Sequence, residues 1–198
     1  MASNLLEGLT FKVADDEERL RALELRTRIY TQELGTTGQD RFDTLAFHLI
    51  AKDSTGSVVA CLRIVGPEDR PFDIERLVDI SPFVQTGKSP AEISRFCVEP
   101  SHRDIAPGHT IHLGMLKLVY EFTLRYHITD LFTLVMPHLI TFYRFILFKP
   151  LHVNCEHPIF GSAHLMHLDL DGVRRRLQHA STPVAQLLFH TDLPNVVV

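Results

Sequence analysis

The sequence AEISRFCVEPSHRDIAPGHT, residues 91–110, decides how this chain folds. Its first half, from Ala91 to Val98, alternates its side chains in the manner of a β-strand. The alternation predicts that Glu92 and Ser94 share one face of the strand. Arg95 is expected to point to the other face and to anchor Asp40 or Asp43. Glu92 is therefore the carboxylate that we expect inside this strand.

A loop and a helix follow the strand directly. Pro100 ends the strand, because proline has no N–H to donate to a β-ladder. The loop runs over residues 103–108, and a helix begins at His109 or Thr110. Strand, loop and helix N-terminus together gather backbone N–H groups and the positive end of a helix dipole. This layout predicts a site for phosphate or pyrophosphate, although a plain strand-to-helix connection has the same layout.

Composition sets the class of protein. The chain has 198 residues, enough for one α/β domain with a hydrophobic core, and we expect residues 1–198 to form that single domain. Hydrophobic residues make up 45% of the chain, which argues against disorder. The formal net charge of −4 does not indicate a protein that binds nucleic acid. We expect no membrane span and no secretory signal, because no apolar stretch is long enough.

Cysteines and histidines indicate the compartment and argue against a metal site. Cys61, Cys97 and Cys155 are odd in number and widely spaced, so we expect no disulfide framework. The reducing cytoplasm is the compartment that this pattern favours. Among the twelve histidines, His152 and His157 lie close to Cys155, but their spacing matches no zinc template. We therefore expect these histidines to lie on strands and at the surface.

Periodicity and turn signals predict a mixed order of strands and helices. The expected strands are 9–13, 47–52, 58–65, 91–98, 130–136, 152–158 and 163–170, and the expected helices are 15–34, 109–127, 137–147 and 173–190. Asp171-Gly172 is interpreted as a turn, and residues 66–90, with four prolines, as an irregular lid or wall. The fold class is α/β, a mixed sheet with helices on both faces.

The loop after the central strand resembles the pantetheine-pyrophosphate signature of the GNAT acyltransferase superfamily. The resemblance rests on the spacing V-x-P-x-x-R-x-x-A-x-G, formed by Val98, Pro100, Arg103, Ala106 and Gly108. The usual form is R/Q-x-x-G-x-G/A. Here Ala106 replaces the first glycine, and Pro107 removes one N–H donor. A loop with one fewer donor favours a single phosphate, and hence acyl carrier protein over coenzyme A.

The resemblance implies a GNAT-like fold in which the central strand and its neighbour splay apart. The pantetheine arm of the donor would lie in this opening and take backbone hydrogen bonds, much as an added strand does. The residues implied in donor binding are Phe96, Cys97, Val98, Arg103, Ala106, Gly108 and His109. No tightly bound cofactor is implied, because the acyl-phosphopantetheine thioester is a substrate.

Within the superfamily, residues 10–150 are most similar to the acyl-homoserine-lactone synthases and the N-acyl amino acid synthases. The similarity rests on charged residues that occur in the right order in L-R-x-x-I-Y, D-R-F-D, C-L-R-I and E-I-S-R-F. The acceptor-binding residues that it implies are Arg26, Tyr30, Asp40, Asp43, Arg63 and Arg95. The same charged residues could instead form an ion-pair network that pins the loop to the sheet, since buried charges require partners.

Two departures favour an amino acid or a similar small amine as the acceptor. The lactone synthases place a tryptophan after the L-G that follows the first helix, whereas this chain has Thr36 there and no tryptophan at all. The run Phe142-Tyr143-Arg144 with Phe148-Lys149-Pro150 resembles the F-Y-x-x-x-G-F run of ordinary GNAT enzymes and N-acyl amino acid synthases. A lactone synthase that uses S-adenosylmethionine remains the alternative.

The expected chemistry is acyl transfer from a thioester to an amine. Glu92 would accept the proton of the amine, directly or through a water that Ser94 positions. Tyr143 resembles the superfamily's usual acid for the departing thiolate, and an aromatic packing role fits it equally well. Cys97 is the less favoured alternative nucleophile. The acyl chain is expected among Phe96, Met115, Leu134, Phe142 and Phe145.

Other classes of function remain open from the sequence. The chain could acylate an amine on a peptide, or it could be a non-catalytic module that binds acyl carrier protein. The run Arg174-Arg175-Arg176 is either a solvated helix face or part of a surface that docks the acidic carrier protein. The partners expected are acyl carrier protein and a small-molecule amine.

Overall fold

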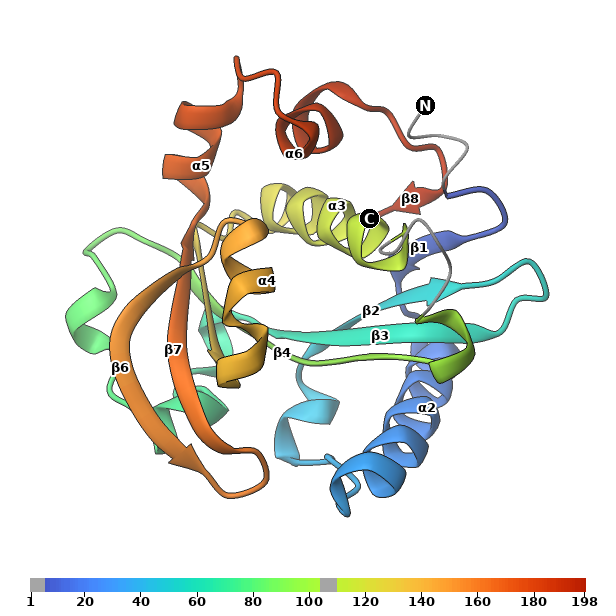
Figure 1. The fold of residues 1–198 in the computed structure, drawn as a ribbon, viewed down its shortest axis with the longest axis horizontal. Coiled ribbons are helices and arrows are strands. Elements are labelled where there is room, and N and C mark those ends of the chain that lie inside the picture. Colours follow the sequence, from blue (N-terminus) through green and yellow to red (C-terminus); the bar gives the residue numbers. More distant parts are fainter. Residues whose placement is uncertain (1–5, 104–109) are drawn as a thin grey trace.

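The computed structural model describes residues 6–103 and 110–198. Three of the residues predicted to bind the donor, Ala106, Gly108 and His109, lie outside this part of the chain. One mixed sheet holds eight strands in the order β6-β7-β5-β4-β3-β2-β1-β8, with helices on both faces (Figure 1). The α/β class and the mixed sheet expected from the sequence are confirmed.

The strands and helices occur in the predicted order along the chain. The strands are β1 Thr10–Val13, β2 Phe47–Lys52, β3 Val58–Val65, β4 Pro90–Val98, β5 Asp130–Val135, β6 Lys149–His157, β7 Gly161–Asp169 and β8 Val196–Val197. The α-helices are α2 Asp16–Leu34, α3 Thr110–Arg125, α4 Ile140–Phe145, α5 Leu170–Leu177 and α6 Pro183–Ala185, followed by a π-turn over Gln186–His190. Short 3-10 turns cover Arg41–Thr44, Pro67–Asp69, Asp73–Arg76, Ser81–Phe83, Pro100–His102 and Pro137–Leu139.

Local signals placed several elements correctly. Asp15 and Glu18 form a reciprocal capping box at the start of α2, and Gly35 ends that helix with φ 68°. The hairpin of β2 and β3 has the predicted bounds. In contrast, Asp171-Gly172 is not a separate turn. Asp169 accepts a hydrogen bond from the N–H of Gly172, so these residues begin α5 instead.

β4 and β5 splay apart, as the resemblance implied. They pair in parallel only from Pro90–Glu92 to Asp130–Phe132, although β4 runs on to Val98 and β5 to Val135. Beyond the last pair, β4 stays paired with β3 on one side, and its pairing with β5 on the other side ends. The backbone groups of β4 after Glu92 are therefore not bonded to β5.

The two faces of the sheet hold different residues. α2 packs on one face, where Ile29 and Cys61 are buried together. α3 packs on the opposite face, where Met115 and Leu62 belong to the larger core (Figure 1). Successive residues of β3 thus alternate between the two cores, as expected for a strand that is covered on both faces.

Gly114 is expected to be required for the contact between α3 and β1. A Cβ at this position would lie 2.1 Å from Cζ of Phe11, a ring that is completely buried. Alanine favours a helix by about 1 kcal/mol over glycine, but crowding in a packed core costs about 1–3 kcal/mol. We expect Gly114→Ala to lower the urea midpoint of unfolding. The double variant Gly114→Ala with Phe11→Leu should regain part of that loss, because leucine leaves room for the added Cβ. A single variant as stable as the parent would contradict this packing.

Glu18 is expected to make stability depend on acid. Burial raises the pKa of Glu18, but hydrogen bonds from Lys12 and Lys52 outweigh burial and lower the pKa to about 2. The resulting stabilisation is present above about pH 4.5 and is lost as the pH falls toward 2. Because both lysines are partly exposed, we expect on the order of 2 kcal/mol.

Glu18→Gln tests this expectation. Glutamine keeps an oxygen for the capping-box hydrogen bond from the N–H of Asp15 and removes the charge. Urea midpoints measured between pH 2.5 and 6 should fall more steeply with acid for the parent than for the variant. Parallel curves for the two proteins would show that the lysine contacts do not stabilise the fold.

Candidate active site

Arg63 on β3 lies at the centre of a buried charged cluster. Its side chain is 0% exposed. Nη1 donates to Asp40 at 2.5 Å and to Asp43 at 3.1 Å. Nε donates to the hydroxyl of Ser94 at 3.2 Å, and Nη2 lies 3.5 Å from Oε1 of Glu92. Ser94 and Glu92 therefore share a face of β4, as predicted, and both meet Arg63.

The segment D-R-F-D joins α2 to this cluster. Asp40 accepts a hydrogen bond from the N–H of Phe42 at 2.9 Å, and Asp43 accepts one from the N–H of Asp40 at 3.0 Å. The two aspartates thus cap the 3-10 turn between them. Oδ2 of Asp43 also accepts from Arg26 on α2 at 2.5 Å. Asp43 therefore bridges the helix and the sheet through two arginines.

Arg95 reaches the same cluster through an irregularity in β4. The register with β3 shifts between Cys61 and Arg63, and Arg95 has φ 59°. Its Nη2 donates to Asp40 at 2.7 Å and to Asp73 at 3.1 Å. The prediction that Arg95 points away from Glu92 and Ser94 is wrong, because the extra residue of the bulge breaks strict alternation. Its expected contact with Asp40 or Asp43 is confirmed for Asp40.

Two contacts attach the proline-rich segment 66–90 to the central strand. Asp73 pairs with Arg95, and the N–H of Ile74 donates to Oε2 of Glu92 at 3.0 Å. Glu92 is 1% exposed. Burial raises the pKa of Glu92, while the positive charge of Arg63 opposes that rise. Sequence reasoning missed Asp73, since no motif or periodicity marks it.

The charges of the cluster nearly balance. Three guanidinium groups face four carboxyl groups, and burial favours the protonated form of one of them, Glu92. Three guanidinium nitrogens are nevertheless buried without a hydrogen-bond partner among the described residues: Nε of Arg26, Nη2 of Arg63 and Nε of Arg95. The network is thus structural, and these three nitrogens are not used by its hydrogen bonds.

Aromatic side chains lie on the other face of β4 from the charged cluster, where β4 and β5 separate. Phe96 on β4 meets His112 on α3 edge to face at 5.2 Å, and His112 meets Phe142 on α4 at 5.3 Å. Tyr143 packs edge to face against Phe142 at 5.8 Å, and burial raises the pKa of Tyr143 to about 12. His112 was not predicted from the sequence, because a single histidine near the start of a helix has no distinctive pattern.

Cys97 is poorly placed to act as a nucleophile. It lies opposite Cys61 on β3, with 3.4 Å between the two sulfurs, and both side chains are buried. Burial and the neighbouring sulfur raise the pKa of Cys61. No histidine contacts either sulfur in the part of the chain that the structure describes. Buried, closely paired thiols of this kind are unreactive.

Other predicted residues fall at the edges of the site. Tyr30 on α2 is buried and meets Phe160 edge to face at 6.3 Å. Arg103 donates to the carbonyl of Val98 at 2.9 Å and pairs with Glu33 at 2.7 Å, so it ties the end of β4 to α2.

The predicted acyl-chain residues do not form one continuous wall. Met115 belongs to the core under α3, and Leu134 packs with the residues under segment 66–90. The side chain of Phe145 is 57% exposed, so its predicted place in an enclosed wall is wrong. Phe96 and Phe142 remain together at the splay through His112.

Within residues 6–103 and 110–198, no group of three or more histidine, cysteine or acidic side chains is arranged to hold a metal ion. None of the helices in that part of the chain has both the length and the apolar character to cross a membrane. Cys61, Cys97 and Cys155 are free thiols.

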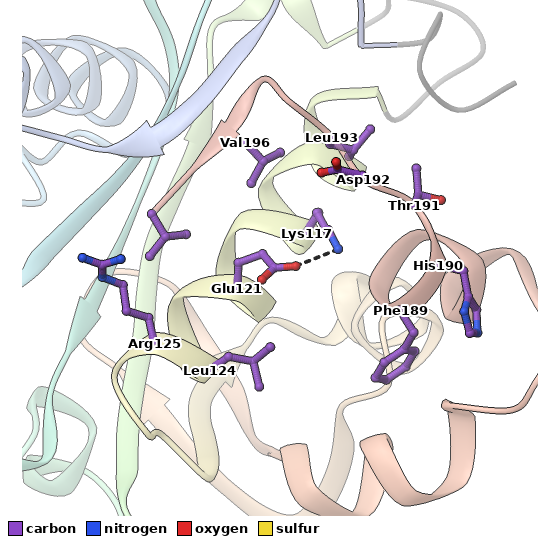
Figure 2. Close-up of a pocket in the computed structure, with 11 residues that line it drawn as sticks. Lys117, Glu121, Leu124, Arg125, Phe189, His190, Thr191, Asp192, Leu193 and Val196 are labelled. Atoms are coloured by element: carbon purple, nitrogen blue, oxygen red, sulfur yellow. Dashed lines mark ion pairs between the residues drawn. The ribbon is translucent and has the colours of Figure 1, made fainter.

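A separate cavity of about 730 Å³ lies between α3 and the segment that leads to β8 (Figure 2). It is lined by Lys117, Glu121, Leu124, Arg125, Phe189, His190, Thr191, Asp192, Leu193, Val196 and Val198. Lys117 is paired with Glu121 at 2.7 Å and donates to the carbonyl of Leu188. None of the predicted site residues lines this cavity, so it is distinct from the charged cluster.

The fold and the match of a family model define the class of this chain. Residues 25–108 match the model of the acetyltransferase (GNAT) domain, and this range contains the whole charged cluster. The splayed pair β4 and β5 agrees with that match. Residues 25–108 therefore match a GNAT domain, and the resemblance to this superfamily that the sequence indicated is confirmed.

Individual relatives point to the predicted branch. L-ornithine N(alpha)-acyltransferase of Rhodobacter capsulatus is 29% identical over 149 residues, a match that covers 64% of this chain and 56% of that relative. FeeM, an N-acyl amino acid synthase from uncultured soil microbes, has a similar structure, with a TM-score of 0.74, 16% identity, and coverage of 90% of this chain and 96% of FeeM. The CoA-dependent acyl-homoserine lactone synthase BjaI also has a similar structure, with a TM-score of 0.64 and 18% identity. The match covers 96% of this chain and 93% of BjaI. The resemblance to this branch is confirmed.

Proposed function

We propose that residues 1–198 act as one GNAT-like domain that transfers an acyl group from a phosphopantetheine thioester to the amine of an amino acid. One observation carries the proposal. The splay between β4 and β5 joins a face with paired arginines and carboxylates to a face lined by aromatic rings. A charged acceptor suits the first face, and an acyl thioester suits the second.

The proposed reaction needs a base, an oxyanion site and an acid. An α-ammonium group must lose a proton before its nitrogen can attack the thioester carbonyl. Glu92 accepts this proton, directly or through a water held by Ser94. The N–H groups of β4 beyond its last pair with β5 stabilise the oxyanion. When the carbon–sulfur bond breaks, the thiolate takes a proton from Tyr143, and the second proton that the attacking nitrogen loses returns to Tyr143 through solvent.

We propose acyl carrier protein as the donor, with coenzyme A as the alternative. Pro107 leaves the phosphate-binding loop one N–H short, which favours a single phosphate over a pyrophosphate. The alternative has support from BjaI, whose structure is known with isopentyl-CoA, so a similar fold does take an acyl-CoA. Docking of the carrier protein on the exposed Arg174, Arg175 and Arg176 remains part of this proposal.

An amino acid is the acceptor that the charged cluster supports best. Asp40 and Asp73 can meet an ammonium group, and the unpaired Nε of Arg95 can meet a carboxylate. The relative from Rhodobacter capsulatus is named for L-ornithine, which belongs to this class. A lactone synthase that uses S-adenosylmethionine is the second candidate, because lactone synthases share the fold. We place the reaction in the cytoplasm, which three free thiols support.

Purified protein tests the proposal directly. It is incubated with acyl carrier protein or coenzyme A carrying one acyl group, and with a panel of amino acids, S-adenosylmethionine and a lysine-containing peptide. Mass spectrometry then identifies acylated products. An N-acyl amino acid formed faster from the carrier protein supports the proposal in full. A lactone, an acylated peptide, or no product with any donor would overturn it.

A further inference from the structure

The cavity between α3 and the C-terminal segment is bounded by a stretch of chain that is anchored at both ends. At one end, Nζ of Lys117 donates to the carbonyl of Leu188 at 2.9 Å. At the other end, β8 pairs in parallel with β1, and the side chain of Asn195 donates to the carbonyl of Leu9 at 2.8 Å. The cavity has a volume of about 730 Å³, within the range of about 300–1,000 Å³ that is usual for small-molecule sites (Figure 2). Its walls are therefore held in place by contacts within the chain.

Lys117 places a buried cation with an unused donor on the wall that α3 forms. Its side chain is 8% exposed. An ammonium group has three N–H donors, of which one meets the carbonyl of Leu188 and one meets Oε1 of Glu121 at 2.7 Å. Among the described residues, the third N–H has no acceptor and Oε2 of Glu121 has no partner. An unused donor and an unused acceptor thus lie next to each other at the cavity (Figure 2).

The charged side chains around the cavity favour a ligand without net charge. Lys117 and Arg125 supply two positive charges, and Glu121 and Asp192 supply two negative charges. Because these charges balance, a simple anion or cation meets as much repulsion as attraction. A zwitterion can instead place its carboxylate against Lys117 and its ammonium group against Glu121, so that both of its ends are attracted.

The spacing of Lys117 and Glu121 and the apolar lining narrow the class of ligand further. The two charged groups lie only 2.7 Å apart, so the two charges of the ligand must also be close neighbours. An α-amino acid meets this condition, because a single carbon atom joins its ammonium group and its carboxylate. Leu124, Phe189 and Leu193 also line the cavity and can cover an apolar side chain of the ligand. The cavity is therefore complementary to an apolar α-amino acid.

We propose that this cavity is a binding site for an apolar α-amino acid, in which Lys117 holds the carboxylate and Glu121 holds the ammonium group. The site is separate from the charged cluster, which α2 joins through Arg26 on the other face of the sheet. The inference does not depend on the proposed acyl transfer, because binding here needs no thioester. A ligand that binds the folded chain should also raise its unfolding temperature.

Isothermal titration calorimetry with four related ligands tests the chemistry of the site. L-Leucine carries all three features, 3-methylbutylamine lacks the carboxylate, 4-methylpentanoate lacks the ammonium group, and glycine lacks the apolar side chain. The loss of a hydrogen bond to a charged group, or of a buried apolar side chain, weakens binding by about 10- to 100-fold. We therefore expect leucine to bind at least about tenfold more tightly than each of the other three ligands.

Two substitutions locate the binding site. Lys117→Met keeps an unbranched side chain and removes the charge and the donors. Glu121→Gln removes the negative charge, keeps an oxygen for Lys117, and leaves the hydrogen bond from Lys117 to Leu188 in place. Each variant should bind leucine about 10- to 100-fold more weakly than the parent. Arg21→Ala, on the outer face of α2, is the control and should bind leucine as the parent does.

The outcomes separate this inference from the proposed function. Thermal unfolding first shows which variants are folded, and Glu121→Gln alone decides the test if Lys117→Met does not fold. Weaker leucine binding in every folded cavity variant supports the site, even if the chain acylates no amine. If these variants keep the parent affinity, leucine occupies another site, such as the charged cluster, and the inference fails while the proposed function stands. Equal affinity for leucine and its two truncated analogues, or no binding of leucine at millimolar concentration, also overturns the inference.

Discussion

Replacing Arg63 by alanine is expected to lower the free energy of unfolding by about 3–5 kcal/mol. The guanidinium group is completely buried and pairs with Asp40, Asp43 and Glu92 at the same time. Among the described residues, its removal leaves Glu92 without a cationic partner, and Asp43 and Asp40 keep only Arg26 and Arg95. A buried charge that loses its partner costs far more than an exposed one. Chemical unfolding of Arg63→Ala, followed by circular dichroism, measures the loss.

Arg21→Ala is the matched control for Arg63. Arg21 pairs with Glu17 on the outer face of α2 at 2.5 Å, but both side chains are half exposed or more. Such a pair contributes about 0–1 kcal/mol, so the control should unfold near the parent midpoint. Equal, small losses in the two variants would show that the cluster does not stabilise the fold.

The sequence predicted the parts of the fold that are encoded locally. Asp15, Glu18 and Gly35 mark both ends of α2 within the helix itself, and the structure places them as predicted. The hairpin of β2 and β3 follows from alternation and one turn, and its bounds are also correct. Segments of this kind need no information from the rest of the chain.

Contacts between distant segments were harder to predict. That Arg26, Asp43 and Arg63 converge followed only from the family resemblance, because they lie on a helix, a loop and a strand. The positive φ of Arg95 has no sequence signal, since a residue other than glycine seldom adopts it. β8 was missed because it is two residues long and is defined by pairing with β1.

Asp73 shows the same limitation within the charged cluster. It reaches Arg95 from a segment that periodicity describes only as a lid. Sequence spacing indicates which side chains share one element, but not which side chains from different elements meet. The contacts of the charged cluster were therefore predicted incompletely, whereas the bounds of the central strand were predicted well.

Glu92→Gln is expected to reduce turnover by about a hundred- to ten-thousand-fold, the usual effect of removing a general base. Glutamine keeps the shape of the side chain and an oxygen for the N–H of Ile74. Its amide cannot take a proton from the amine. Because burial raises the pKa of Glu92, the parent's rate should increase with pH as the carboxyl group ionises.

The pH profile separates a base from a structural carboxylate. The loss in Glu92→Gln should shrink at high pH, because free amine becomes abundant above the ordinary α-amino pKa of about 8. Glu99→Gln, just beyond β4 and paired with the partly exposed Arg28, should keep parent turnover and serves as the control. Glu92→Gln also removes the ion pair with Nη2 of Arg63, which should lower the stability of the variant. Its rates are therefore corrected for the fraction of protein that is folded. Near-parent turnover of the folded variant at neutral pH would show that Glu92 only holds Ile74 and Arg63 in place.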